Sequence, residues 1–299
     1  MKYLSKFRSP KATIVLGLTA VLLLSILGAA FGSSVLQFIQ YKPQSMNTGI
    51  SVASAKSIAD RAFKVISPSS TLSDAKLAKV LPHQNDVWQV DYGKDGEVQV
   101  DAKTGKLLFI ISEKSFMDMA NNTNNGTFIT EDQAISSAND YASKMSLDIE
   151  GILSSANLVH DKGGTTGADV WDLKWHRKSH GYIFKNDFII AGIDAKTKEL
   201  LAYNNCFYSN EPSSFSINIK AATAIENAQA TADQNGYTLN GKASLMIVNP
   251  NYRWTDEAMK EPNPDTRLAW VIPFEKPNGV GEIYIDAENG SLLGGDETK

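Results

Sequence analysis

Residues 100–108 read Val-Asp-Ala-Lys-Thr-Gly-Lys-Leu-Leu, and this stretch decides the fold because it recurs twice. Residues 193–201 read Ile-Asp-Ala-Lys-Thr-Lys-Glu-Leu-Leu, and residues 285–293 read Ile-Asp-Ala-Glu-Asn-Gly-Ser-Leu-Leu. An apolar residue before an Asp-centred turn and an apolar pair after it are typical of two strands joined tightly. The aspartates are 194 − 101 = 93 and 286 − 194 = 92 residues apart, which indicates a repeated structural unit.

The three aspartates, Asp101, Asp194 and Asp286, are candidates for turn formation rather than for catalysis or metal binding. An Asp side chain can accept hydrogen bonds from the main chain of its own turn. Gly105 and Gly290 then supply a residue that tolerates positive φ. Lys198 replaces that glycine in the middle copy, which leaves its turn open to a different geometry.

A tryptophan-led stretch precedes each turn: Trp-Gln-Val-Asp-Tyr at 88–92, Trp-Asp-Leu-Lys-Trp at 171–175 and Trp-Val-Ile-Pro-Phe at 270–274. Alternation with period two places the large side chains on one face of a strand. We therefore predict that Trp88, Trp171 and Trp270 hold equivalent places in three superimposable units. Proline cannot donate a ladder hydrogen bond, so Pro273 predicts an edge strand or a bulge in the third copy.

An alanine-rich helix is expected at the start of each unit. Thr130 and Gln133 have the spacing of a capping box before the second helix, and Gly236 is a candidate C-cap after the third. A further apolar stretch separates each helix from its tryptophan strand. The expected order is a helix followed by three or four strands, three times over. The apolar stripes of the three helices are Ala55, Ile58, Ala59, Ala62 and Ile66; Ile135, Ala138, Ala142 and Met145; and Ala221, Ile225, Ala228 and Ala232.

The N-terminal region predicts a membrane segment. No charged residue occurs from 12 to 41, and the apolar core at 14–31 approaches the roughly 20 residues that span about 30 Å of hydrocarbon. A retained anchor and a cleaved signal peptide are the two alternatives. In both cases the basic residues before it stay in the cytoplasm and the rest of the chain lies outside. These residues are Lys2, Lys6, Arg8 and Lys11.

The predicted fold class is α+β, with an N-terminal transmembrane helix followed by three repeated units, each a helix packed on an antiparallel sheet. The expected divisions are a basic cytoplasmic tail (1–11), the anchor or signal segment (12–33), a stalk (34–49), unit one (50–112), an Asn-rich linker (113–127), unit two (128–210), a short linker (211–216) and unit three (217–299), which contains a long inserted loop (249–267).

Charge and cysteine content exclude several classes of function. Of the 29 basic residues four precede the membrane segment, which leaves 25 against 33 acidic residues and a charge of about −8. Such a surface repels phosphate backbones, so nucleic acid is not an expected partner. The single cysteine, Cys206, can form neither an internal disulfide nor a cysteine-based zinc site. We expect it to be a buried small hydrophobe.

No catalytic motif occurs in the chain. His-Glu-x-x-His, Gly-x-Ser-x-Gly, a phosphate-binding loop and a dinucleotide fingerprint are all absent. His176 and His180 are interpreted as solvated residues of a polar turn rather than metal ligands. We therefore expect no enzyme, no catalytic residue and no cofactor. An unrecognised hydrolase remains an alternative, because a catalytic triad is assembled in space rather than in sequence.

The segment 249–267 contains the candidate partner-binding residues Tyr252, Arg253 and Trp254. Tyr, Trp and Arg are favoured at interface hot spots, and long loops in compact domains are often functional. The alternative is that Trp254 folds back onto the core of the third unit.

The helix, the Trp-x-Val-x-Tyr strand and the Val-Asp-Ala-Lys-Thr-Gly-Lys-Leu-Leu ending together resemble the PepSY family. Unit one, Ile50–Ser112, is the nearest match, and the other two units look like longer, diverged relatives. The resemblance implies a helix packed against an antiparallel sheet. It also implies a role in peptidase inhibition or folding assistance, and it offers no catalytic residue to carry over.

These observations predict a membrane-anchored extracytoplasmic binding or regulatory module that restrains a peptidase. The alternative is a structural or sensory ectodomain of the cell envelope. The expected partners are the membrane, through the N-terminal helix, and a protein such as a peptidase. The expected location is the cell membrane as a single-pass protein with its C-terminal part outside, or the exterior if the segment is cleaved.

Overall fold

The computed structural model describes residues 38–40, 49–80, 85–121, 127–147, 149, 151–160, 169–255 and 265–298. Within these ranges, no helix is both long enough and apolar enough to cross a membrane. The segment at 12–33, for which a membrane helix is expected, lies outside the described residues.

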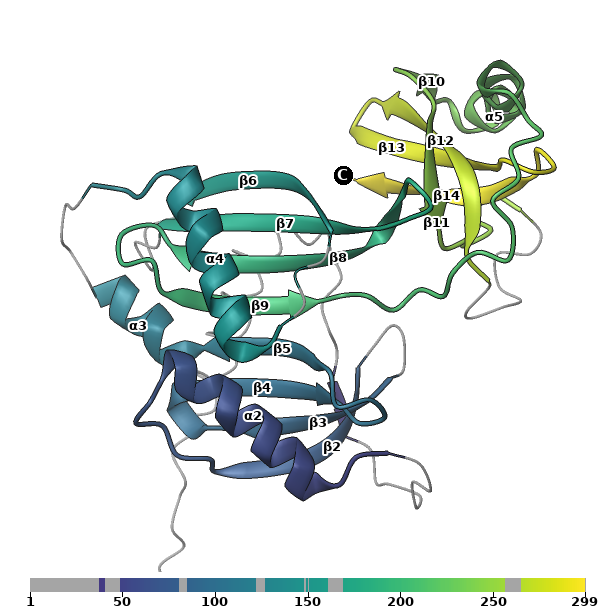
Figure 1. Ribbon diagram of the computed structural model, residues 1–299. Coiled ribbons are helices and arrows are strands. Elements are labelled where there is room, and N and C mark those ends of the chain that lie inside the picture. Colours follow the sequence, from purple (N-terminus) through teal and green to yellow (C-terminus); the bar gives the residue numbers. More distant parts are fainter. Residues whose placement is uncertain are drawn as a thin grey trace, which may run out of the picture.

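Fourteen strands and four α-helices are assigned in the described part of the chain (Figure 1). The helices are α2 (Val52–Ile66), α3 (Glu113–Asn121), α4 (Glu131–Met145) and α5 (Ala221–Asn235), with a 3-10 turn η1 (Gly93–Asp95). The strands are β1 (Phe38–Gln40), β2 (Asp74–Val80), β3 (Asn85–Asp91), β4 (Gly96–Asp101), β5 (Leu107–Ser112), β6 (Ile152–His160), β7 (Asp169–Ser179), β8 (Tyr182–Asp194), β9 (Leu200–Asn205), β10 (Thr238–Leu239), β11 (Ser244–Val248), β12 (Arg267–Lys276), β13 (Gly279–Asp286) and β14 (Leu292–Thr298).

Helix boundaries follow the local sequence signals. Thr130 and Gln133 exchange the two hydrogen bonds of a capping box, so α4 begins where the sequence predicts. Gly236 ends α5 in the left-handed conformation, as expected of a C-cap. Ser51 caps α2 by accepting from the Ser54 N–H.

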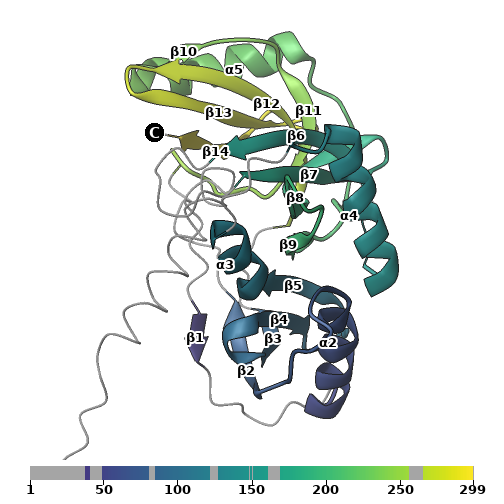
Figure 2. The same cartoon turned by 90° about the vertical axis from the view of Figure 1, so that its left-hand side faces the viewer.

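The three units contribute strands to one continuous sheet, which corrects the expectation that each unit has its own. β5 of the first unit pairs antiparallel with β9 of the second, so the strand order runs β2-β3-β4-β5-β9-β8, and β7 and β6 continue beyond β8. Helices α2 and α4 cover one face of this sheet and α3 lies on the other (Figure 2). Pairing between units is a non-local contact, and no local sequence pattern in β5 or β9 predicts it.

The helix-covered face has a single hydrophobic core that contains residues of both units. Ala55 and Ala59 on α2 are fully buried there, as are Ala134 and Leu173 of the second unit. Alanine faces let both helices lie close to the strands, and tight packing of this kind makes the core sensitive to any loss of volume.

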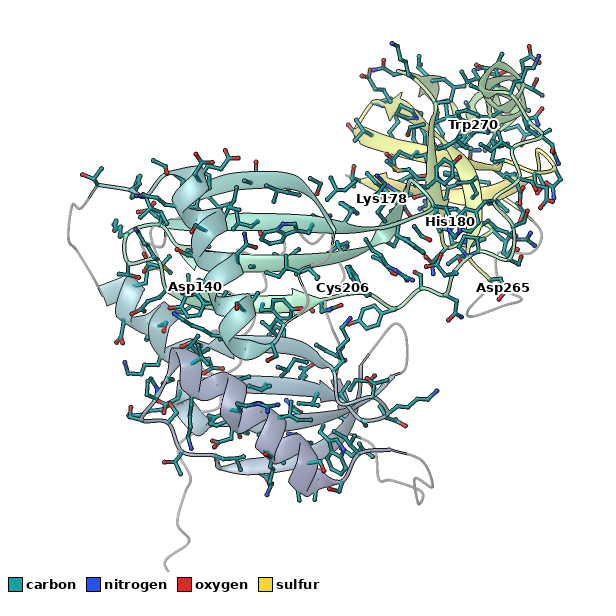
Figure 3. All side chains as sticks on the ribbon, in the orientation of Figure 1. Asp140, Lys178, His180, Cys206, Asp265 and Trp270 are labelled. Atoms are coloured by element: carbon teal, nitrogen blue, oxygen red, sulfur yellow. The ribbon has the colours of Figure 1, made fainter. Side chains whose placement is uncertain are left out.

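The third unit has a core of its own. Helix α5 packs Ala224, Ala228 and Ala232 against β12 and β13. The unit joins the rest of the chain through a short parallel pairing, in which Met246 and Ile247 of β11 face Ile183 and Phe184 of β8. In Figure 3 the end of the β7–β8 hairpin, marked by Lys178 and His180, reaches the third unit.

An ion pair stabilises this junction. Asp187 on β8 is 1% exposed, and its Oδ2 lies 3.1 Å from Nη1 of Arg177 on β7. The Ser209 hydroxyl donates to Asp187 Oδ1 at 2.7 Å, and Arg177 Nη2 donates to Glu211 Oε1 at 2.6 Å. A buried carboxylate is tolerated when it is paired and hydrogen-bonded, so these contacts hold the segment after β9 against the hairpin.

Two expectations about local structure are wrong. Glu113–Asn121 is helix α3 and not part of a linker, because Phe116 and Met119 pack one turn apart against Ile111 and Leu201. β12 is not an edge strand, since β13 pairs with one side of it and both β10 and β11 pair with the other. Pro273 is in register with Glu282 of β13, and on its other side it lies opposite the break between β10 and β11, where a missing N–H interrupts no ladder.

Candidate functional site

The three repeated tryptophans make the same contact. The indole Nε1 of Trp88 donates to the Ile50 carbonyl at 3.1 Å, that of Trp171 to Ile129 at 3.1 Å, and that of Trp270 to Ile219 at 2.8 Å. Each isoleucine precedes the helix of its own unit. Each indole therefore fixes the entry of a helix onto its strand, and all three rings are partly buried in this structural role.

The three repeated aspartates form turns. Oδ1 of Asp101 accepts from the N–H groups two and three residues later, at 3.0 and 2.6 Å. Asp194 and Asp286 accept the two equivalent bonds. Lys198 takes φ +70° where Gly105 takes +77°, so the middle turn has the same geometry despite the missing glycine. No group of three or more potential metal-ligating side chains occurs in the described ranges.

The segment 251–255, which contains the predicted contact residues, lies against β14 in an unusual conformation. Tyr252 has φ +50° and Trp254 has φ +66°. A bulky residue with positive φ costs roughly 1–2 kcal/mol, and such strain persists only where surrounding contacts enforce it. Nowhere else in the described chain do two non-glycine residues with positive φ lie within three positions of each other.

Asn251 supplies the enforcing contacts. Its Nδ2 donates to the Gly295 carbonyl at 2.8 Å and its Oδ1 accepts from the Gly295 N–H at 3.0 Å. The side chain thus makes the two hydrogen bonds with Gly295 that a neighbouring strand would make. The Arg253 N–H also donates to Asn251 Oδ1, at 3.1 Å. A Cβ at Gly294 would lie 2.0 Å from that oxygen, which explains why glycine is required there.

The rings of the segment face inward and the guanidinium faces outward. Trp254 meets Tyr237 and Phe274 edge to face, at centroid distances of 6.0 and 6.1 Å. Tyr252 packs against the cluster of Tyr284 and Leu293 on the other face of the third unit. Both rings thus belong to the packing of the unit, the alternative that the sequence left open for Trp254. Arg253 between them is exposed.

Glu297 on β14 anchors the polar part of this surface. It accepts from Tyr237 Oη at 2.6 Å, pairs with Arg253 Nη2 at 2.9 Å and also pairs with Lys276. The hydrogen bonds from Lys276 and then Tyr237 lower the pKa of Glu297. The bond to Glu297 raises the pKa of Tyr237. The result is a positioned arginine beside aromatic rings, a surface suited to recognition rather than to proton transfer or nucleophilic attack.

Asn251, Tyr237 and Glu297 were not found by sequence reasoning. Asn251 acts on Gly295, which lies 44 positions later, and Tyr237 and Glu297 are 60 positions apart. The Gly294–Gly295 pair in a strand was the one available signal, because glycine in a strand often marks close backbone approach.

The remaining candidates from the sequence lie elsewhere. His176 is in β7 and not in a loop, with Nδ1 2.9 Å from the Phe184 carbonyl, and burial lowers its pKa. His180 is in the following turn, with its ring 4.1 Å from that of Phe215. Cys206, expected to be buried, is partly exposed, and burial of its thiol raises the pKa to about 12, which disfavours the thiolate.

Residues 49–110 match the model of the PepSY family, described as the peptidase propeptide and YPEB domain. The match covers α2 and strands β2 to β5, with the turn at Asp101, and it stands for a small α+β module. No curated protein matches the chain.

Two solved structures are similar to the chain. The C-terminal domain of YpeB from Bacillus megaterium is 11% identical with a TM-score of 0.47, and the match covers 85% of this chain and 100% of that domain. An uncharacterized protein from Eubacterium rectale is 8% identical with a TM-score of 0.47, covering 86% of this chain and 84% of its own.

Proposed function

We propose that the chain is a non-catalytic regulatory module that binds a protein partner outside the cytoplasmic membrane and restrains a peptidase. The observation that carries this proposal is the strained segment 251–255. Asn251 and Glu297 hold Arg253 in place before any partner arrives, so little conformational entropy remains to be lost on binding. The PepSY match of the first unit supports a peptidase as the partner.

The proposal extends to the organisation of the chain. We infer that the second and third units are diverged copies of the first, since the same indole and aspartate bonds recur in each. Residues 12–33 serve as the membrane anchor in this proposal, which places all three units outside the cell. The hydrophobic run of the sequence supports the anchor.

The test compares affinity capture by the full chain and by two single variants. Arg253→Ala removes the displayed guanidinium, and Lys242→Ala removes an exposed cation elsewhere on the third unit. The wild type and Lys242→Ala should capture a peptidase from the native envelope in equal amounts. Arg253→Ala should capture at least about tenfold less of it. Thermal melting of the three proteins should be equal within about 1 °C, because surface substitutions change little.

Two results would contradict the proposal. Equal capture by all three proteins would remove Arg253 from the contact surface. Failure of the wild type to retain any peptidase would instead favour the structural alternative, in which the units act as spacers of the cell envelope.

A further inference from the structure

The strand before each tryptophan strand occupies the same place in all three units. β2, β6 and β11 each pair antiparallel with the tryptophan strand that follows them. The register is also the same, because Leu77 faces Trp88, Leu158 faces Trp171 and Leu245 faces Trp270. The outer edges of these three strands can therefore be compared directly.

Two of these outer edges are covered by another strand. β1 pairs antiparallel with β2, with Phe38 opposite Val80, and β8 pairs parallel with β11. In both cases the covering strand comes from outside the unit. β6 pairs only with β7 among the described strands, so no described strand lies along the outer edge of its nine residues. In the described part of the chain the same place in the framework thus accepts an added strand twice and has none in the third case.

The chemistry of β6 is that of a covered strand. Exposed edges are normally protected by charges, proline or a capping group. β14, at the other end of the sheet, carries Asp296 and Glu297 and has the Asn251 amide on Gly295. β6 contains no Asp, Glu, Lys, Arg or Pro, and its Ile152 is 39% exposed. β11, equally free of charge, is covered by β8.

We propose that the outer edge of β6 pairs antiparallel with the β6 strand of a second copy of this chain. A two-fold axis near Ala156 places Ser155 of one copy opposite Asn157 of the other. The contact is isologous and closes at a dimer, the commonest symmetry among oligomers. An edge without charge offers nothing to select a different partner and nothing to repel its own copy.

The test introduces like charges across the two-fold axis. Ala156 packs into the shared core, whereas Ser155 and Asn157 alternate with it and point to the other face. In the variant Ser155→Lys/Asn157→Lys, each lysine faces a lysine of the second copy. In Ser155→Glu/Asn157→Glu, each glutamate faces a glutamate. The matched control, Ser136→Lys/Ser143→Lys, adds the same charge to exposed positions of α4.

The full chain is studied in detergent by sedimentation equilibrium. The wild type and the α4 control should be dimers, and the dissociation constant of either β6 variant should rise at least about tenfold. An equimolar mixture of the lysine and glutamate variants should recover the dimer. A wild type that is still monomeric at about 50 μM would overturn the proposal, because a stable dimer would be associated at that concentration. So would a dimer unchanged in both β6 variants, which would place the contact elsewhere.

Discussion

The first two units and the third unit pack their helices against the sheet in different ways. The first two place α2 and α4 side by side on one continuous sheet and share a core, whereas the third keeps a separate core under α5. All three nevertheless use the same indole and aspartate bonds. The local framework therefore fixes how a helix meets its strands. The pairing of β5 with β9 joins the first two units into one body with a shared core, and the third unit is the second body.

The largest expected effect separates the two bodies directly. Leu173 is fully buried in the shared core, so Leu173→Ala should cost about 3–4 kcal/mol through lost burial and the cavity left behind. Because the core is shared, hydrogen exchange should accelerate in α2 as well as in α4 and remain unchanged in α5. Acceleration in α4 alone would show that the first unit folds independently of the second.

A smaller effect is expected at the junction between the bodies. Asp187→Asn removes the charge that pairs with Arg177 and weakens the bonds from Ser209. We expect a loss of about 2 kcal/mol, because Arg177 keeps Glu211 as a partner. Proteolysis within residues 211–216 should become faster, while the melting temperatures of the shared core and of the third unit's core should stay the same. An unaltered cleavage rate would mean that the β8–β11 pairing and the packing of Phe184 against Ile247 and Leu268 hold the third unit without this ion pair.

Substitution of the tryptophans tests whether the same indole bond stabilises the first two units and the third unit separately. Trp88→Phe and Trp270→Phe each remove one indole donor and leave a carbonyl without it, at a cost of about 1 kcal/mol. In differential calorimetry the first variant should lower the transition of the shared body, and the second that of the third unit. If both variants lower the same transition equally, the chain melts as one body and the comparison fails.

The smallest expected effect is a gain in stability. Lys198 occupies a left-handed position that glycine occupies in the other two turns, so Lys198→Gly should stabilise the shared body by about 0.5–1 kcal/mol. Gly290→Ala imposes the reverse change on the third unit and should destabilise it by a similar amount. Denaturant midpoints measure both, and a destabilised Lys198→Gly protein would show that the lysine side chain has a separate structural role.

Much of each unit follows from local sequence. The start of α4 at Thr130 and the end of α5 at Gly236 are set by hydrogen bonds within four residues. The tryptophan strands show their alternation directly. What the sequence does not reveal is long-range. The pairing of β5 with β9 joins residues about 95 positions apart, and helix α3 depends on a packing partner at Leu201.

The candidate site divides in the same way. Composition identified Tyr252, Arg253 and Trp254, but not that two of these side chains face inward. Their orientation depends on positive φ values, which Asn251 enforces through a strand 44 positions away. No local propensity favours that conformation for tyrosine or tryptophan, so only the folded chain distinguishes the exposed arginine from its partly buried neighbours.

The acceptors of the three indole bonds are main-chain carbonyls, and the aspartate turns bond main-chain N–H groups. A backbone partner is present whatever side chain occupies the position, so each unit needs to keep only a tryptophan and an aspartate for this framework. The other residues of a unit are constrained by packing rather than by these bonds, as the alanine faces of the helices show. The family model matches residues 49–110, whereas the same indole and aspartate bonds occur again beyond them, around Trp171 and Trp270.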